Sequence, residues 1–421
     1  MSTTDYSLRL IWIVLLTGLT VQRPSFSLLK KGLEYSEERE RLCLEETDKD
    51  IIPAANRLLK YQSFVQNKHL GLVVNHTSVV GASHLVDTLL KVGCKIQKIF
   101  APEHGFRGKA DAGKPIPSKV DKKTGIPIIS AYGKNKKLKQ EELAGIDLMI
   151  FDIQDVGARF YTYTSTMTYV MEACAKAGIP LLILDRPNPT GHYVDGPILE
   201  TDQRSFVGLH PVPIVHGLTV AEYARMINGE GWLENGLACE LYYVRCLNYN
   251  HKKFYELPRK PSPNLPNIQS IYLYPSLCLF EGTNVSVGRG TKRPFQLYGH
   301  PDFKKGDCTF TPISRVGARH PLHQGKLCRG YDLTGLTKEE LQAKTQLNLE
   351  YLIDFYKNLN REQKAAFFRS NDFFSRLAGN SSLQEQIRKG VRAKDIRATW
   401  QVGLSAYKEI RKRYLLYEDF E

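Results

Sequence analysis

Short apolar runs alternate with helical patterns over residues 70–185, and this alternation limits the possible folds more than any other feature. The runs are apolar at nearly every position, as in Leu70–Val74 and Pro180–Asp185. Strands that are buried on both faces have such sequences, whereas a strand with one face in water alternates polar and apolar residues. Helical segments between the strands allow the crossovers that parallel pairing needs. The pattern predicts an α/β fold with a parallel sheet covered on both faces.

The expected elements can be placed along the chain. Strands are predicted at residues 70–74, 95–100, 126–131, 147–152, 180–185 and 238–244, and helices after Ser83 and at 138–144, 164–177 and 219–229. Residues 249–280 are rich in proline and tyrosine and are expected to form a long irregular connection. From about residue 299, amphipathic patterns predict helices at 341–359, 363–368, 383–389 and 401–413. We expect a smaller α/β domain with a helical end after the first sheet.

The N-terminus has the pattern of a secretory signal. Arg9 precedes the apolar run 10–21, which polar residues follow. This run is short for a membrane span, so we expect cleavage near Ser25–Ser27, export to the periplasm and no stable membrane anchor. An uncleaved signal anchor is the alternative. The expected division is a signal peptide at 1–27, an extension and helix at 28–69, a Rossmann-like catalytic domain at 70–275 and a smaller domain at 276–421 that completes a cleft.

The net charge of +14 favours polyanionic partners such as nucleic acid, anionic lipid or an acidic cell-wall polymer. Much of the excess lies in the lysine-rich stretch 109–139, which is best interpreted as a solvated surface loop. The chain has no nucleic-acid motif, and an exported protein rarely meets nucleic acid, so we predict no such partner. The eight cysteines form no Cys-x-x-Cys pair, which argues against a zinc ribbon or a thioredoxin-type site. One or two disulfides stay possible.

Several common cofactor signatures are absent from the sequence. No Gly-x-Gly-x-x-Gly, phosphate loop or Gly-x-Ser-x-Gly elbow is present. No histidine, cysteine or carboxylate set has metal-ligand spacing. Asp152 and Asp155 could chelate Mg²⁺, but hydrogen bonding is the favoured role for both. We therefore predict neither a cofactor nor a metal site.

Polar clusters follow four of the predicted strands. The ligands of open α/β sheets bind beyond the carboxyl ends of the strands, so these clusters predict a binding crevice. Each also has a structural interpretation, as a turn, a cap, a salt bridge or a set of helix N-terminal acids. The candidate residues, including a later acidic loop, are Asn75, His76, Glu103, His104, Arg107, Asp152, Gln154, Asp155, Arg159, Tyr161, Tyr163, Asp185, Arg186, Asn188, Glu281, Asn284 and Arg289.

These clusters, in this order, resemble the NamZ-type exo-β-N-acetylmuramidases. The resemblance runs from about Leu70 to the C-terminus and includes the motifs Asn75–Thr77, Pro102–Gly108, Asp152–Tyr163, Asp185–Pro189, Glu281–Asn284 and Gly288–Thr291. It implies a Rossmann-like domain, a smaller C-terminal domain and a cleft between them. It also implies release of N-acetylmuramic acid from the non-reducing ends of peptidoglycan fragments, so the expected partners are peptidoglycan-derived disaccharides or muropeptides. The family's proposed catalytic glutamate corresponds to Glu103.

The chemistry of glycoside hydrolysis fits this set of residues. Two carboxylates usually flank the bond, and Glu103 is the expected general acid and base. Asp152, Asp155, Asp185 and Glu281 compete for the second role, and substrate assistance by the 2-acetamido group is a further option. N-acetylmuramic acid carries a lactyl carboxylate that a guanidinium could bind, and the candidates are Arg107, Arg159, Arg186 and Arg289. A non-catalytic glycan-binding module and a lytic, eliminating glycosidase are the alternatives, and the oligomeric state stays open.

Overall fold

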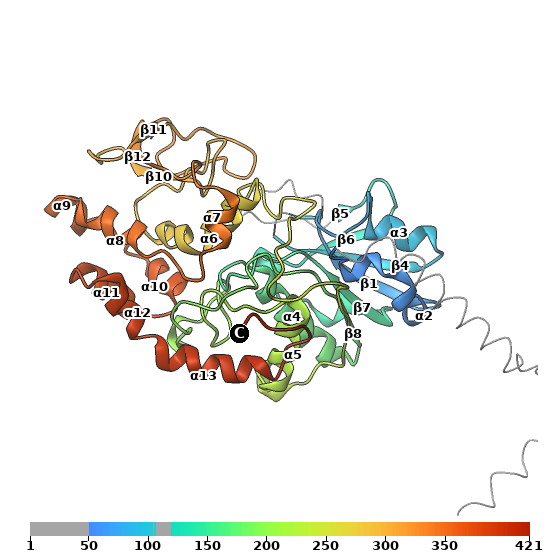
Figure 1. Cartoon of the computed structure of the whole chain (residues 1–421). Coiled ribbons are helices and arrows are strands. Elements are labelled where there is room, and N and C mark those ends of the chain that lie inside the picture. Colours follow the sequence, from blue (N-terminus) through green and yellow to red (C-terminus); the bar gives the residue numbers. More distant parts are fainter. Residues whose placement is uncertain (1–49, 104, 107–118) are drawn as a thin grey trace, which may run out of the picture. The chain divides into compact units, whose positions relative to one another are not determined.

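The computed structural model describes residues 50–103, 105–106 and 119–421 (Figure 1). Its larger sheet has the strand order β5-β6-β4-β1-β7-β8-β9. All neighbouring pairs are parallel except β5 and β6. The strands are β1 (His69–Val74), β4 (Lys95–Ala101), β5 (Lys119–Val120), β6 (Pro127–Ser130), β7 (Leu148–Asp152), β8 (Leu181–Leu184) and β9 (Leu241–Val244). This arrangement confirms the predicted Rossmann-like domain with a parallel sheet, to which the antiparallel β5 adds one edge strand.

The two faces of this sheet pack into two different cores, which explains why its strands are apolar throughout. In β7, Met149 and Phe151 join one hydrophobic cluster, whereas Leu148 and Ile150 join the other. Successive side chains of a strand point to opposite faces, so burial of both faces requires apolar residues at every position. The helices of this region are α2 (Gln62–Val65), α3 (Leu85–Lys91), α4 (Tyr163–Ala177) and α5 (Val220–Gly229), and a small hairpin pairs β2 (Val79–Val80) with β3 (Ser83–His84).

The second, smaller domain combines a three-stranded antiparallel sheet with helices, and lies mainly to the left in Figure 1. The sheet order is β10-β12-β11. Its strands are β10 (Leu297–His300), β11 (Cys308–Phe310) and β12 (Cys328–Asp332). The helices are α6 (Ile268–Leu277), α7 (Lys338–Gln342), α8 (Glu350–Lys357), α9 (Arg361–Ala365), α10 (Phe373–Ala378), α11 (Ser382–Arg388), α12 (Ala393–Ala398) and α13 (Gln401–Lys412). The predicted fold class is confirmed, while the proposed boundary between residues 275 and 276 stays a prediction.

Two predicted elements within residues 249–359 differ from the structure. The expected helix at 341–359 is split into α7 and α8. The segment between them bonds to the first domain instead of continuing the helix, since the Leu347 N–H donates to Asp195 Oδ2 at 2.7 Å. The expected irregular connection at 249–280 ends instead in α6, although that helix contains Pro275. The Asn267 side chain caps α6 by accepting from the Ser270 N–H at 2.9 Å. A contact with Asp195 therefore interrupts the helical pattern at 341–359, and a side-chain cap allows a helix to form in the proline-rich segment.

Residues 51–66 form short turns where one helix was expected. They comprise the 3₁₀ turns Ala54–Asn56 and Leu58–Lys60 and the four-residue α2. The backbone before these turns already pairs with the sheet region, since the Ile52 N–H donates to Leu247 O and the Ala54 N–H donates to Asp185 O, both at 3.0 Å. The signal peptide and the rest of the expected extension, residues 1–49, lie outside the described residues.

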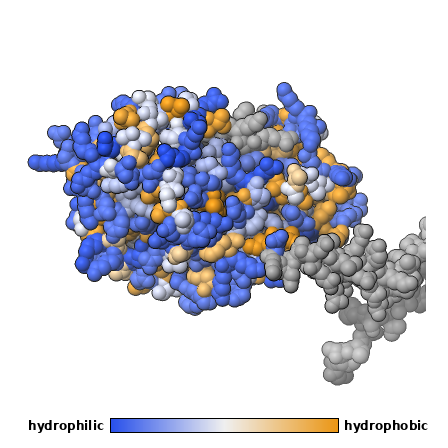
Figure 2. All heavy atoms as spheres, turned by 45° about the horizontal axis from the view of Figure 1, so that its top comes forward, coloured by the Kyte–Doolittle hydropathy of each residue, from blue (hydrophilic) through white to orange (hydrophobic). Residues whose placement is uncertain are grey.

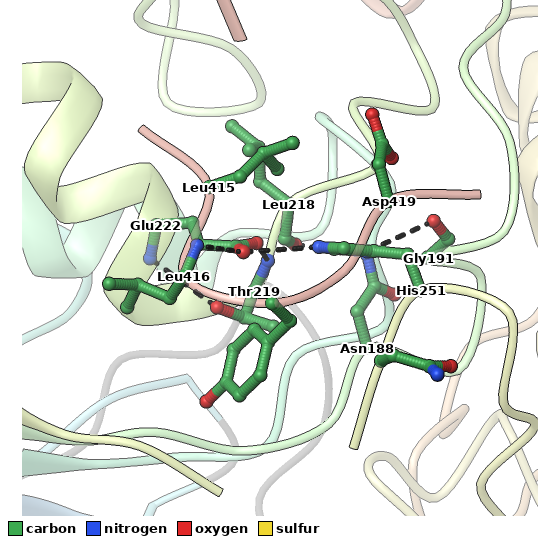
Figure 3. Close-up of polar contacts among 12 residues, drawn as sticks. Asn188, Gly191, Leu218, Thr219, Glu222, His251, Leu415, Leu416 and Asp419 are labelled. Carbon is green, nitrogen blue, oxygen red and sulfur yellow. Dashed lines mark hydrogen bonds and ion pairs between the residues drawn. The ribbon is translucent and has the colours of Figure 1, made fainter. Parts of the chain in front are cut away.

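The last residues of the chain return to the first domain (Figure 3). The buried Glu222 carboxylate accepts from the backbone N–H groups of Leu416 and Thr219, both at 2.8 Å, and lies 3.1 Å from His251 Nε2. Tyr417 donates to Asp185 Oδ2 at 2.7 Å. The C-terminal segment therefore helps to complete the hydrogen bonding of the larger sheet's domain.

Hydrophilic side chains cover most of the face in Figure 2. No helix in the described part of the chain is long and apolar enough to cross a membrane. The cysteines at 94, 174, 239, 246, 278, 308 and 328 are all unpaired, and Cys43 lies outside the described residues.

Candidate active site

Glu103 lies just beyond the carboxyl end of β4, in the turn that Pro102 and Gly105 form. The Gly105 N–H donates to Pro102 O at 2.9 Å, and the φ of Gly105 is +75°, a conformation that favours glycine. Tyr132 donates to Glu103 Oε1 at 2.9 Å, and Thr162 donates to Oε2 at 2.7 Å. Tyr132 follows β6 and Thr162 precedes α4, so two other parts of the first domain hold both oxygens of this carboxylate.

A cavity of about 700 Å³ opens at Glu103. One wall comes from the first domain and includes Tyr132, Phe160, Thr162 and Phe206. Residues of the second domain form the opposite wall: Tyr274, Cys278, Glu281, Arg289, Arg319, His320, Arg369 and Phe373. The Tyr132 and Phe206 rings lie 5.6 Å apart. The cavity thus combines carboxylates, guanidinium groups and aromatic faces, which suit an anionic sugar.

Glu281 and Arg289 form an ion pair in this cavity, with Arg289 Nε 2.7 Å from Glu281 Oε1. Burial lowers the pKa of Arg289, but the carboxylates of Glu281 and Glu103 contribute to a net rise above its usual value. Among the carboxylates predicted from sequence, Glu103 and Glu281 line the cavity and Asp152, Asp155 and Asp185 do not.

Asp152 and Arg186 form a buried pair behind the strand ends. Arg186 Nε lies 2.5 Å from Asp152 Oδ1, and Nη2 lies 2.9 Å from Oδ2. The remaining Arg186 contact is to Val79 O at 3.2 Å. Burial lowers the pKa of Arg186, but the Asp152 carboxylate raises it above its usual value. The two side chains satisfy each other, so neither is placed to contact a sugar.

Asp155 is buried beside two tyrosines. Its Oδ1 accepts from the Gly157 N–H at 2.7 Å, and burial raises its pKa to about 7. Tyr161 donates to Pro261 O at 2.9 Å, and the Tyr161 and Tyr163 rings lie 4.9 Å apart. Gln154 donates to Asp155 O and Pro187 O, both at 2.8 Å. None of these residues lines the cavity, so this part of the predicted site holds the loops together.

Arg159 is 1% exposed and donates to four backbone carbonyls. Its Nη1 binds Pro197 O and Val212 O at 2.9 and 2.8 Å. Its Nη2 binds Leu377 O and Ala378 O at 2.9 and 2.7 Å, at the end of α10. Burial lowers its pKa to about 9. Arg159 therefore joins the two domains, and its guanidinium is not directed at the cavity.

Asp185 and Asn188 are also tied to the backbone. Asp185 accepts from the Ala221 N–H at 3.0 Å and from Tyr417, and burial raises its pKa to about 7. Asn188 donates to Leu218 O at 2.9 Å and accepts from the Thr190 N–H at 2.9 Å. Both residues order the loop after β8 and lie outside the cavity lining.

The remaining candidates lie in several places. Asn75 Oδ1 accepts from the backbone and side chain of Thr77, at 2.8 and 2.6 Å. His76 Nε2 lies 2.8 Å from Lys260 O. The backbone of Asn284 pairs with Phe367 and His323. His104 and Arg107 lie outside the described residues, so their predicted contacts stay predictions.

Sequence reasoning missed Tyr132, Thr162, Phe206 and Arg369. Tyr132 directly follows the predicted strand at 126–131, so the rule that selected Glu103 could have found it. Thr162 lies inside the quoted motif at 152–163, but it was not selected from that motif. Phe206 and Arg369 have no local signal, because the folded chain brings them to the cavity from remote positions.

Comparisons with known proteins agree over most of the chain. The family described as "Exo-beta-N-acetylmuramidase NamZ, N-terminal" matches residues 70–269, and the corresponding C-terminal family matches residues 272–417. The chain is 38% identical to the "Peptidoglycan beta-N-acetylmuramidase NamZ" of Bacillus subtilis (strain 168) over 377 residues, which are 85% of this chain and 89% of that protein.

Two crystal structures of DUF1343 family proteins from Bacteroides fragilis NCTC 9343 have a similar fold. One has a TM-score of 0.81 at 47% identity and covers 88% of this chain and 100% of its own. The other has a TM-score of 0.75 at 26% identity and covers 87% of this chain and 99% of its own. The sequence matches and the cavity at Glu103 lead to one conclusion: the chain belongs to the NamZ family of glycosidases.

Proposed function

We propose that this protein is an exo-acting glycoside hydrolase that releases N-acetylmuramic acid from the non-reducing ends of peptidoglycan fragments. Its relative in Bacillus subtilis is named a peptidoglycan β-N-acetylmuramidase. The observation that carries the proposal here is the position of Glu103, which lines the cavity while Tyr132 and Thr162 bind its two oxygens.

Glu103 acts as the general acid and then as the general base in this proposal. It gives a proton to the glycosidic oxygen as the bond to C1 breaks, so the leaving sugar departs as a neutral alcohol. The resulting carboxylate then accepts a proton from the water that attacks C1. Tyr132 and Thr162 hold the carboxyl group in one orientation. The group therefore stays aligned with the glycosidic oxygen in the first proton transfer and with the water in the second.

Glu281 is the second carboxylate that we propose for the reaction. It lines the same cavity, where its carboxylate forms the ion pair with Arg289. A fixed negative charge stabilises the positive charge that develops on the sugar ring in the transition state. Asp152, Asp155 and Asp185 are excluded from this role in our proposal, because their contacts lie outside the cavity lining.

The test uses the purified protein and the disaccharide in which N-acetylmuramic acid is β-linked to N-acetylglucosamine. We expect free, hydrated N-acetylmuramic acid and N-acetylglucosamine, detected by mass spectrometry. Glu103→Gln should lower the rate by about 10²–10⁴-fold. The matched control is Glu141→Gln, which changes an exposed glutamate outside the cavity lining and should have normal activity.

Three outcomes would contradict the proposal or its assignment of the acid. Binding of the disaccharide without any product would favour a glycan-binding module. An anhydro sugar, lighter than the hydrated product by one water, would favour a lytic enzyme. Equal rates for Glu103→Gln and Glu141→Gln would move the acid to another residue.

We also propose that the protein is exported to the periplasm after cleavage of its N-terminal signal. Arg9 and the apolar run at 10–21 support this proposal, as does a substrate that belongs to the cell wall. N-terminal sequencing of the mature protein should start beyond about residue 20, the end of the apolar run. An intact Met1 on cytoplasmic protein would contradict it.

A further inference from the structure

Arg369 lines the cavity and lies in the segment between α9 and α10. The Arg369 N–H donates to Gly282 O at 3.0 Å, and the Asn284 N–H donates to Phe367 O at 2.9 Å. A bridge between Thr283 and Phe368 lies between these bonds. The acidic loop at 281–284 and the segment at 367–369 therefore form a short antiparallel ladder, which fixes Arg369 relative to Glu281.

Close packing strengthens this ladder. A Cβ atom on Gly282 would lie 2.4 Å from Phe374 Cα, so a side chain would not fit there. Phe367 is 0% exposed and Phe368 is 6% exposed. The backbone that carries Arg369 is thus anchored on buried residues, although the Arg369 side chain itself is exposed.

The guanidinium of Arg369 is oriented by one bond and keeps its outer edge available. Its Nε donates to Thr283 O at 2.9 Å. Within the described part of the chain, no carboxylate forms an ion pair with Arg369. By contrast, Arg289 is paired with Glu281, and Arg319 already has an interaction. Arg369 therefore presents two terminal N–H₂ groups, a planar fork that matches a carboxylate.

The charges in the cavity define where an anionic substituent can bind. The Glu281 carboxylate repels another carboxylate, so an acidic sugar must direct its anion to a cationic part of the wall. N-acetylmuramic acid differs from N-acetylglucosamine by a lactyl ether at O3 that ends in a carboxylate. Building on the function proposed above, we propose that Arg369 binds this lactyl carboxylate and makes the site specific for muramic sugars.

The experiment measures binding of three sugars by calorimetry: N-acetylmuramic acid, its neutral lactyl amide and N-acetylglucosamine. The wild-type protein should bind the acid more tightly than the amide. Arg369→Met keeps most of the aliphatic stem and should weaken binding of the acid about 10- to 100-fold, the effect of losing charge-assisted hydrogen bonds. Its affinities for the amide and for N-acetylglucosamine should stay within about twofold, because the lost interaction needs the anion.

Two further variants complete the test. Arg369→Lys keeps the charge and loses the fork, so it should give an intermediate affinity for the acid. Arg376→Met is the matched control, since Arg376 is an exposed arginine on α10 outside the cavity lining, and its affinities should equal those of the wild type.

Equal weakening of all three sugars by Arg369→Met, or no weakening, would overturn the inference. These outcomes leave the proposed function intact if the wild-type protein still hydrolyses the disaccharide. Conversely, a wild-type protein that binds the acid through Arg369 but releases no sugar would overturn the proposed function and keep the inference.

Discussion

The loops after β7 and β8 and the loops after β4 and β6 are both polar, yet they serve different purposes. At the end of β7 and in the loops after β7 and β8, the side chains of Asp152, Arg159 and Asp185 are buried and bound by protein partners. After β4 and β6, Glu103 and Tyr132 bind each other and also face the cavity. A polar residue at a strand end therefore does not identify a site by itself. What distinguishes the two regions is whether the side chain still faces solvent-accessible space after its internal contacts are made.

The largest expected effect on stability comes from breaking the buried pair. Arg186→Met leaves the Asp152 carboxylate buried without its partner, and loss of one member of such a pair lowers the free energy of unfolding by about 3–5 kcal/mol. Arg289→Met breaks the ion pair with Glu281 in the cavity, whose two side chains are 28% and 22% exposed. Because solvent reaches this pair, its loss should lower the free energy of unfolding by only roughly 0–1 kcal/mol. Urea unfolding checks both values. Similar losses for the two variants would show that the buried pair contributes no more to stability than the cavity pair.

The next prediction concerns pH. Burial raises the pKa of Asp155 to about 7, above its ordinary value of 3.8, so the folded state holds a proton that the unfolded state has lost. The free energy of unfolding should therefore fall as the pH rises from about 4 to about 7, by up to about 1.4 kcal/mol per pH unit for this group. Asp155→Asn removes this contribution.

The difference between wild-type and Asp155→Asn stability, measured by thermal unfolding across this window, isolates the group from other titrating residues. Asp155→Asn should become relatively more stable towards pH 7 and should retain most of its hydrolytic activity. A loss of activity as large as that of Glu103→Gln would place Asp155 in the catalytic machinery and contradict our assignment.

The sequence predicted the structure best where a short stretch of residues decides the outcome by itself. Continuous apolar runs predict strands buried on both faces, and parallel strands place Glu103 at the same edge as Asp152 and Asp185. The rule that ligands bind at the carboxyl ends of the strands does not show which of these side chains are buried in contacts within the protein. Arg159 shows why, since its acceptors at Leu377 and Ala378 are 218 and 219 residues away in the chain. Arg369 shows the reverse case, because the ladder between residues 281–284 and 367–369 brings it to the cavity.

A smaller effect is expected from Tyr132→Phe. The variant removes one hydrogen bond to Glu103 and leaves the ring, so kcat should fall about tenfold, the effect of losing one hydrogen bond to a charged group. The melting temperature should change little. Tyr169→Phe is the control, because Tyr169 is a half-buried tyrosine beside Phe206 that does not line the cavity. Unchanged kcat for Tyr132→Phe would show that this bond does not position the acid.

The central claim is that Glu103 donates the proton to the leaving sugar, and leaving-group dependence tests it most directly. The measurement compares Glu103→Gln with the wild type on the natural disaccharide and on a nitrophenyl β-N-acetylmuramide, following the bond-breaking step by rapid mixing. We predict a loss of about 10²–10⁴-fold on the disaccharide and a much smaller loss on the nitrophenyl substrate, whose leaving group needs little protonation. Equal losses on the two substrates, or near-normal turnover of the disaccharide, would contradict the assignment of Glu103 as the general acid.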